Sequence, residues 1–353
     1  MDLRKTQTYI SLQILYTFLA VILMVYHSTQ HYQNSGTSLF WDFFLFGEIG
    51  EDLLFVLMGF TIFYTSEHFI EKQSGYKEYM IKTLSRIFLI YWMLIAIPGL
   101  IMWFVNPEFH HSIAKIKADE LWQMVFMWFG HPRIAVITWV LTHLVFFAIL
   151  FGLAIISKKF KILWYIILFI STINLIDRVF IGSELFGDPL KAFYKIFSPH
   201  NLEFAFGALA YYFFKNGYTI KRYKLFLILT LIAFFTIGAI HTYTELDFYH
   251  ERVLIFGVIS MILVIAVVNY SKFVSPPANN IFYKLGEAEY IMLLIHGPIL
   301  SIINFKYAVH SSFGWIITLA TIFFILVISY FIRSKIEAPA LAFVNKKTLG
   351  KED

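Results

Sequence analysis

The stretch Leu12-Gln-Ile-Leu-Tyr-Thr-Phe-Leu-Ala-Val-Ile-Leu-Met-Val-Tyr-His-Ser28 decides the fold of this chain. It has the length and the apolar character of a helix that spans a bilayer. It also ends in an ionisable ring, His27. An ionisable side chain on a spanning helix is by default a candidate for function, because the bilayer itself gives no reason to place it there. His27 is therefore the first candidate site residue.

The composition places the chain among integral membrane proteins. Hydrophobic residues make up 59% of it and charged residues only 14%, whereas a soluble domain carries about a quarter charged residues. The chain has no cysteine, which excludes disulfides, a thiolate nucleophile and cysteine metal sites. Its basic residues lie in short segments between apolar runs, a pattern that fits membrane orientation better than nucleic-acid binding.

Apolar windows of about 16 to 25 residues predict ten spanning helices. These are expected near residues 9–27, 42–66, 84–105, 137–156, 162–180, 200–215, 224–241, 252–270, 285–304 and 313–333. Most Lys and Arg residues fall on one side if the N-terminus is cytoplasmic, so both termini are expected in the cytoplasm. We predict an all-α integral membrane protein with one domain, residues 1–335, and a short cytoplasmic tail, residues 336–353.

Polar side chains recur where these spans begin or end on the outer side. Glu48 and Asp52 open the second span four residues apart, so they share one helical face, with Glu51 at its border. Other candidates on this side are Trp139 and His143 in the fourth span, Glu203 in the sixth, Arg252 in the eighth and His296 in the ninth. Arg86 instead opens the third span at the cytoplasmic side. The pattern suggests a tunnel with an anion-friendly inner mouth and a histidine and carboxylate outer chamber.

These residue types allow two kinds of chemistry. A neutral histidine beside a carboxylate can accept a proton from a hydroxyl, which could then attack an activated acyl group. Histidine and carboxylate pairs also form the proton relays of transporters, and spacing alone does not separate the two. Three histidines of the longest loop, His110, His111 and His131, lack a convincing metal-ligand spacing, so no metal is predicted.

Eight stretches in order along the chain resemble the membrane acyltransferase 3 family, and most of all its exopolysaccharide O-acetyltransferase branch. They run from Leu12-Gln-Ile-Leu to Val25-Tyr-His-Ser28, then Gly50-Glu-Asp-Leu-Leu-Phe-Val-Leu-Met-Gly-Phe60, Ser85-Arg-Ile-Phe-Leu-Ile-Tyr-Trp92, Trp139-Val-Leu-Thr-His143, Asn201-Leu-Glu-Phe-Ala-Phe-Gly207, Arg252-Val-Leu-Ile-Phe-Gly257, Leu285-Gly-Glu-Ala-Glu-Tyr to Ile295-His296, and Ile336-Glu-Ala-Pro339. Each stretch is weakly specific alone, and their order over nearly the whole chain carries the resemblance.

The resemblance implies transfer of an acyl group, often acetyl from acetyl-CoA, to a sugar hydroxyl of a cell-surface glycan. His27 lies at the position of the family's catalytic histidine, Asp52 at its acidic position and Arg86 at the arginine that begins its R-I-x-P-x-Y motif. His296 matches the late histidine of the Y-L-I-H stretch. The chain also departs from the family, with Tyr16 in place of an arginine eleven residues before the histidine. Further departures are Met58 for a serine, Leu89 for a proline, Leu144 for a glutamate, and the run from Glu289 to His296.

The leading hypothesis is therefore a membrane O-acetyltransferase of a bacterial cell-surface polysaccharide or its lipid-linked precursor. It would be a multi-pass protein of the bacterial plasma membrane that takes acetyl-CoA as co-substrate and has no nucleic-acid partner. His27 would be the general base, oriented by Asp52, and Arg86, Lys82 and Tyr16 would hold the donor. Substrate-binding candidates are Trp139, His143, Glu203, Arg252 and His296.

Several of these roles have structural alternatives. Glu203 and Arg252 could form a buried structural pair, and Trp139 could serve in packing or as an interfacial anchor. The rival function is that of a relative without chemistry, acting as a transporter, flippase or scaffold. The tyrosine at position 16 and the leucine at position 144 favour this rival, whereas a transporter would be expected to show broken helices in paired halves.

Overall fold

The computed structural model describes residues 3–97, 122, 125–127, 138–181, 196–244, 251–274, 277 and 280–350. Every regular element in these ranges is a helix, which confirms the predicted all-α class. The first half of the described chain holds α1 (Leu3–Asn34), η1 (Phe40–Glu48), α2 (Ile49–Lys72), α3 (Tyr76–Tyr91), η2 (Trp92–Ala96), α7 (Thr138–Ile156), η4 (Lys158–Phe160), α8 (Lys161–Ile176) and η5 (Asp177–Ile181). The second half holds α10 (His200–Lys215), α11 (Tyr223–Tyr243), α12 (Arg252–Ser271), α13 (Ile281–Gly286), α14 (Glu289–Ile303), η7 (Asn304–Ala308), α15 (Gly314–Ile332), η8 (Arg333–Glu337) and α16 (Ala338–Leu349).

Seven helical stretches among the described residues are long and apolar enough to cross a bilayer. They are Gln7–Asn34, Tyr76–Ala96, Trp139–Ile156, Lys158–Ile181, Tyr223–Tyr243, Arg252–Ser271 and Gly314–Leu349. The α14 helix is apolar but shorter, α10 has 16 residues, and α2 carries several charged side chains. The chain is thus a multi-pass membrane protein, and the count of ten spans stays a prediction.

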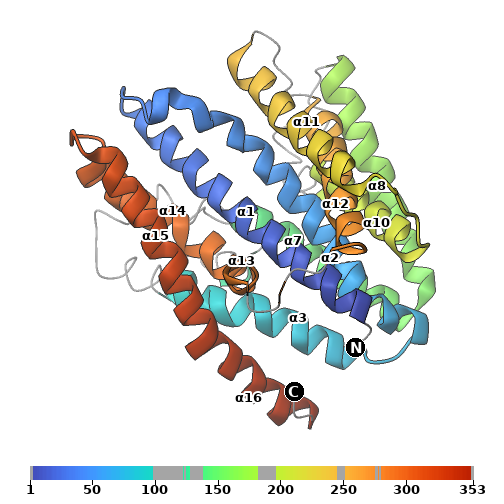
Figure 1. Cartoon of the computed structure of the whole chain (residues 1–353). Coiled ribbons are helices and arrows are strands. Elements are labelled where there is room, and N and C mark those ends of the chain that lie inside the picture. The colour runs from blue at the N-terminus through green and yellow to red at the C-terminus, as the bar shows by residue number, and fades with distance from the viewer. Residues whose placement is uncertain are drawn as a thin grey trace.

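The helix that contains His27 lies in the interior of the bundle. It packs against α2, α12, α13 and α14, and it crosses the middle of the molecule in Figure 1. Its apolar side chains supply much of the core, with Leu19 and Leu23 fully buried. Gly36, at a φ of +73° just beyond its last residue, has the left-handed backbone that commonly ends helices. His27 is therefore held on a rigid and central element.

Other helices turn large apolar side chains outward. Phe169 of α8, Phe180 of η5 and Ile232 of α11 are each more than half exposed, together with many other large apolar residues. A soluble monomer rarely exposes contiguous apolar surface on this scale. This outer surface is what lipid tails would cover, and it agrees with the membrane class read from the composition.

Two glycines bring α2 and α10 into direct backbone contact. A side chain at Gly59 would collide with the carbonyl oxygen of Phe204, and one at Gly207 would collide with that of Val56. Small residues permit such close approach of membrane helices. The contact fixes the start of α10, with His200 and Glu203, beside the start of α2, with Asp52.

The two ends of the chain lie at the same end of the molecule (Figure 1). This arrangement agrees with the expectation that both termini share one side of the membrane. Residues expected to form a short tail are helical as far as Leu349, and α16 packs against α3 and continues the helix of α15 and η8. The boundary expected at residue 335 therefore falls inside η8.

Candidate active site

His27 is held by a short chain of hydrogen bonds on its own helix. Its Nδ1 donates to the side-chain oxygen of Gln30 at 3.1 Å, and the amide nitrogen of Gln30 donates to the hydroxyl of Tyr26 at 2.7 Å. Because an amide oxygen only accepts, this orientation of Gln30 places the proton of a neutral His27 on Nδ1. Nε2 of His27 is then the nitrogen that can accept a proton from a substrate.

A second histidine lies against the first. The rings of His27 and His296 stack at a centroid distance of 5.3 Å and an interplanar angle of 28°. Nδ1 of His296 donates to the carbonyl oxygen of Met292 at 3.1 Å, since a carbonyl cannot donate. Nε2 of His296 is buried and has no hydrogen-bond partner among the described residues. The two predicted residues thus come together from helices α1 and α14, although 269 positions separate them.

The carboxylates at the start of α2 belong to an arginine-centred cluster. Arg252, at the start of α12, donates to both oxygens of Asp52 at 2.7 and 3.2 Å and to Glu48 at 2.6 Å. Glu51 lies 3.6 Å from the same guanidinium. Asp52 is fully buried, so the bidentate contact satisfies a charge that would otherwise be costly at this depth. The expectation that Asp52 orients His27 is not met, because Nδ1 of His27 is bonded to Gln30 and Asp52 is bonded to Arg252.

The residues predicted on α7 and α10 form a neighbouring aromatic and acidic group. The side chains of Trp139, His143 and His200 all pack around the ring of Phe55, and His200 stacks on it at 5.0 Å. Nδ1 of His200 lies 2.9 Å from a carboxylate oxygen of the buried Glu203. Asp52 thus lies between Glu203 and Arg252, so the expected Glu203–Arg252 pair appears as part of a larger cluster rather than as a direct ion pair.

Asp52, His200 and Glu203 could offer ligand atoms to a metal, since these atoms lie within 4.8 Å of one another. The fit is poor, because both oxygens of Asp52 already accept hydrogen bonds from Arg252. A guanidinium beside the site would also repel a second cation. The prediction of no metal stays a prediction, and His110, His111 and His131 lie outside the described residues.

A cavity of about 400 Å³ lies between α1, α2, α3, α7 and α14. Its wall includes three positions at which the chain departs from the family pattern, Tyr16, Met58 and Leu144. Leu54, Ile62, Leu141 and Leu293 add to the apolar part of the wall, and Lys82 and Arg86 add charge. The hydroxyl of Tyr16 is 2.9 Å from that of Thr61. The three residues expected to hold the donor, Tyr16, Lys82 and Arg86, are therefore brought together at one cavity.

Both cations of this cavity already face carboxylates. Arg86 lies 3.4 Å from Glu289, at the start of α14, and Lys82 lies 3.3 Å from Glu78, one helical turn away. All four residues line the cavity. Arg86 and Lys82 are each about 40% exposed, so an anionic ligand could still reach them. The inner mouth is thus polar and charge-balanced rather than simply basic.

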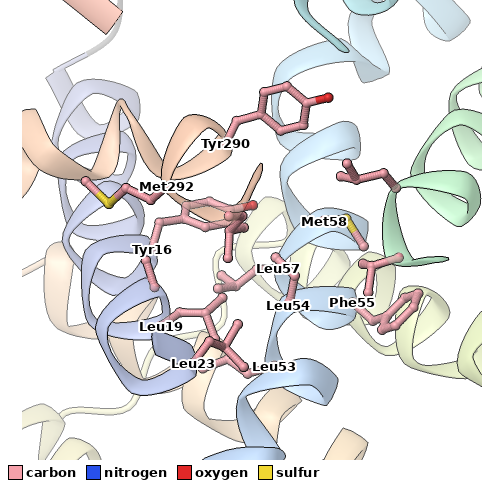
Figure 2. Packing of buried hydrophobic residues seen from close by; sticks show 14 of the residues in the cluster. Tyr16, Leu19, Leu23, Leu53, Leu54, Phe55, Leu57, Met58, Tyr290 and Met292 are labelled. Atoms are coloured by element: carbon pink, nitrogen blue, oxygen red, sulfur yellow. The ribbon is translucent and has the colours of Figure 1, made fainter. Parts of the chain in front are cut away.

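Among the described residues, the cavity at Tyr16 does not reach His27. The cavity wall includes Tyr16 but not His27, eleven residues further along α1, which corresponds to about 16 Å of helix. Between them Leu19 and Leu23 are fully buried, and they pack with Leu53 of α2 (Figure 2). A direct route along this face of α1, from the cavity toward His27, is filled by these leucine side chains.

The sequence interpretation missed three contributors to the site. Gln30 lies three residues after His27, a spacing at which helical side chains meet, so this partner could have been found. Glu289 was noted only as part of a departure from a motif, and His200, the first residue of the predicted span 200–215, was not named as a candidate. Their partners Arg86 and Phe55 are far away along the chain, and no local spacing signals these two contacts. The contact of His200 with Glu203, three residues on, could have been found from the spacing.

A protein-family model described as an acyltransferase domain matches residues 14–334. The matched range includes α1 from residue 14 onward, the carboxylate cluster, the cavity and His296. No curated protein and no solved structure matches the chain.

Proposed function

Because this chain belongs to the acyltransferase 3 family, we propose that it transfers acetyl from acetyl-CoA to a hydroxyl of a bacterial cell-surface polysaccharide or its lipid-linked precursor. The observation that carries the proposal is the environment of His27. Its Nδ1 is bonded to Gln30, which leaves Nε2 as the proton acceptor on a buried helix. General bases of acyl transfer need this arrangement, in which one ring nitrogen is held and the other is available.

In the proposed reaction Nε2 of His27 takes the proton of the sugar hydroxyl. The hydroxyl oxygen attacks the thioester carbonyl, and a carbon–oxygen bond forms as the carbon–sulfur bond breaks. The proton then passes from His27 to the departing thiolate, so the histidine returns to its neutral state. His296, with its Nε2 unpartnered among the described residues and its ring against that of His27, is suited to accept a hydrogen bond from a second hydroxyl of the sugar.

The donor is proposed to bind in the cavity that Tyr16, Lys82 and Arg86 line. Its phosphates would meet Lys82 and Arg86, and its acyl arm would extend along the apolar wall toward Tyr16. Arginine binds phosphate through paired hydrogen bonds, and this guanidinium is exposed enough to make them. Phosphate binding would compete with Glu289 for the same donor groups.

The cluster around Asp52 and Arg252 is proposed to position the acceptor side of the site. Asp52 is tied to Arg252, so its proposed contribution to catalysis is to hold the starts of α2 and α12 together near His27. Glu203, His143 and Trp139 pack beside this cluster and are kept as candidates for substrate contact. The protein is proposed to act in the bacterial plasma membrane, among its lipids.

The direct test replaces His27 in the native host. In a His27→Ala strain the acetyl content of the surface glycan should fall to the level of a deletion strain. His310→Ala changes an exposed histidine that lies outside the site and is the matched control. Both variants must be present in the membrane at wild-type amounts. Unchanged acetylation in the His27→Ala strain would refute the proposal.

A relative without chemistry, acting as a transporter, flippase or scaffold, is the second candidate. The observation that favours it is the pairing of both cavity cations with carboxylates, which reduces the attraction for a phosphate-rich donor. Purified protein separates the two candidates. Hydrolysis of acetyl-CoA, or transfer from it, that is lost in His27→Ala supports the enzyme, and no turnover by the wild-type protein supports the rival.

A further inference from the structure

A second cavity, of about 550 Å³, opens at the end of the molecule opposite both termini. It lies between the turn after α1 and the start of α15, and we call it the outer cleft. Its wall includes Tyr32, Ser38, Trp41, Ser311, Ser312 and Trp315. Tyr32 follows His27 by five residues on the same helix, about 7.5 Å along its axis. Five residues also turn the helix by about 140°, so Tyr32 and His27 lie on different faces of α1. The outer cleft is thus at the same end of α1 as the proposed base and shares no lining residue with the donor cavity.

We propose that the outer cleft binds the glycan acceptor, a proposal that rests on the function proposed above. A sugar ring has apolar C–H faces and a rim of hydroxyl groups. Trp41 and Trp315 offer large flat rings, and the three serines offer small hydroxyls that can donate and accept hydrogen bonds. The volume is in the range of ordinary ligand sites.

The backbone that presents Trp41 is held in an unfavourable conformation. Phe40, Trp41 and Asp42 have φ values of 51°, 54° and 58° in succession. Left-handed backbone is unfavourable for each residue with a side chain, and such strain gathers at functional sites. The hydroxyl of Tyr243 donates to the carbonyl of Asp42 at 2.8 Å and holds the turn from α11. The strained turn leaves the Trp41 side chain 93% exposed at the cleft.

A line of hydrogen bonds connects the wall of the outer cleft with the helix that carries His27. The hydroxyl of Tyr32 is 3.1 Å from that of Thr318, and Thr318 donates to Asn304 at 3.2 Å. Asn304 in turn lies 3.4 Å from Nδ1 of His31. These buried contacts fix α15 and η7 against α1, so a glycan bound in the cleft would be held at a defined position relative to His27.

Exposed aromatic rings also anchor membrane proteins at the lipid headgroups, and the chain offers matched controls for that role. Phe43 is 57% exposed on the same short helix as Trp41, and Phe313 is 67% exposed two residues before Trp315. Neither phenylalanine lines the cleft. An anchoring role would involve all four rings, whereas glycan binding requires the two tryptophans.

The test uses purified full-length protein, acetyl-CoA, and oligosaccharides released from the host's surface polysaccharide and de-acetylated with mild base. We expect Trp41→Ala and Trp315→Ala to raise the KM for the oligosaccharide tenfold or more, with the KM for acetyl-CoA unchanged. Phe43→Ala and Phe313→Ala should stay within twofold of wild type. Trp41→Tyr and Trp315→Tyr, which keep a flat ring, should retain most of the wild-type affinity.

Tryptophan fluorescence with the same oligosaccharides keeps this test separate from the test of the reaction. Saturable quenching that is lost in Trp41→Ala and kept in Phe43→Ala supports the outer cleft, even if the wild-type protein transfers no acetyl group. Equal effects of the tryptophan and phenylalanine variants would assign the rings to membrane anchoring and overturn the inference. Absence of saturable binding to the wild-type protein would overturn it as well.

Discussion

Gln30 accepts a hydrogen bond from Nδ1 of His27 at 3.1 Å, one helical turn further along α1. Its amide nitrogen is bonded to the hydroxyl of Tyr26, so the orientation of the amide is set from the other side. Gln30 touches no reacting atom in the proposed mechanism. It is a positioning residue, which selects the ring nitrogen of His27 that is free to act.

Replacing Gln30 should therefore affect turnover more than binding. We expect Gln30→Leu to lower kcat about tenfold to a hundredfold, a part of what general-base catalysis contributes, with the KM for acetyl-CoA within twofold. Tyr26→Phe should have a smaller effect, because Gln30 can still accept from His27. The measurement is steady-state transfer by purified protein. A kcat for Gln30→Leu equal to that of wild type would show that the hydrogen bond does not matter.

Removing the carboxylate that faces Arg86 should strengthen donor binding. Glu289 lies 3.4 Å from the guanidinium and competes with phosphate for it, so Glu289→Gln should lower the Kd for CoA about threefold to tenfold. That range corresponds to about 0.7–1.4 kcal/mol. Glu78→Gln frees Lys82 in the same way, and a smaller gain is expected there because a lysine cannot bind phosphate through a paired fork. Calorimetric titration with CoA measures the Kd of both variants. A higher Kd for Glu289→Gln than for wild type would contradict the assignment of this cavity as the donor site.

Placing an arginine at position 16 should impair this protein. Tyr16 is buried and bonded to Thr61, and the neighbouring wall at Met58 and Leu144 is apolar. A buried charge without a dedicated partner costs several kcal/mol, so Tyr16→Arg should lower both the thermal unfolding temperature and kcat/KM. Tyr16→Phe, which removes only the hydroxyl, is the control and should change each quantity little. A gain of activity in Tyr16→Arg would instead indicate a donor site that has decayed.

Neutralising Arg252 should destabilise the fold. Glu48, Glu51 and Asp52 would lose their shared cation, and removing one partner of a buried ion pair costs about 3–5 kcal/mol. Lys215→Met offers the comparison, because Lys215 is 43% exposed and bridges Glu67 and Glu71 at the surface. Exposed pairs of this kind contribute about 0–1 kcal/mol. The thermal unfolding temperature in detergent should therefore fall far more for Arg252→Met than for Lys215→Met. Equal decreases in that temperature for the two variants would contradict a stabilising role of the buried cluster.

The sequence was sufficient for the helical membrane class and for naming most of the candidate site residues, whose roles stay predictions. His27, Asp52, Arg252 and His296 all begin or interrupt apolar runs, and an ionisable group in such a place is visible without a structure. The structure adds that Asp52 is bonded to Arg252 rather than to His27. No pattern could show this, because 200 residues separate the two partners.

The departures from the family pattern acquire a common meaning only in three dimensions. Tyr16, Met58 and Leu144 come from three helices, and the sequence presents them as unrelated changes. In the fold they line one cavity, so that its wall carries a neutral tyrosine and two apolar side chains where the family resemblance leads us to expect two charged groups and a serine. The sequence could not show whether the expected tunnel is open. Hydrophobic periodicity identifies the helices, but it does not show how leucine side chains fill the space between Tyr16 and His27.

The buried layer of Leu19, Leu23 and Leu53 has a consequence for the cell that holds this protein. A water-filled path from the donor cavity to the outer cleft would conduct protons and ions, and it would discharge the electrical potential across the membrane. Along this face of α1 the buried leucine side chains would exclude water and ions between turnovers. Under the proposed function, the acyl group would cross a barrier that stays closed to the smallest cations.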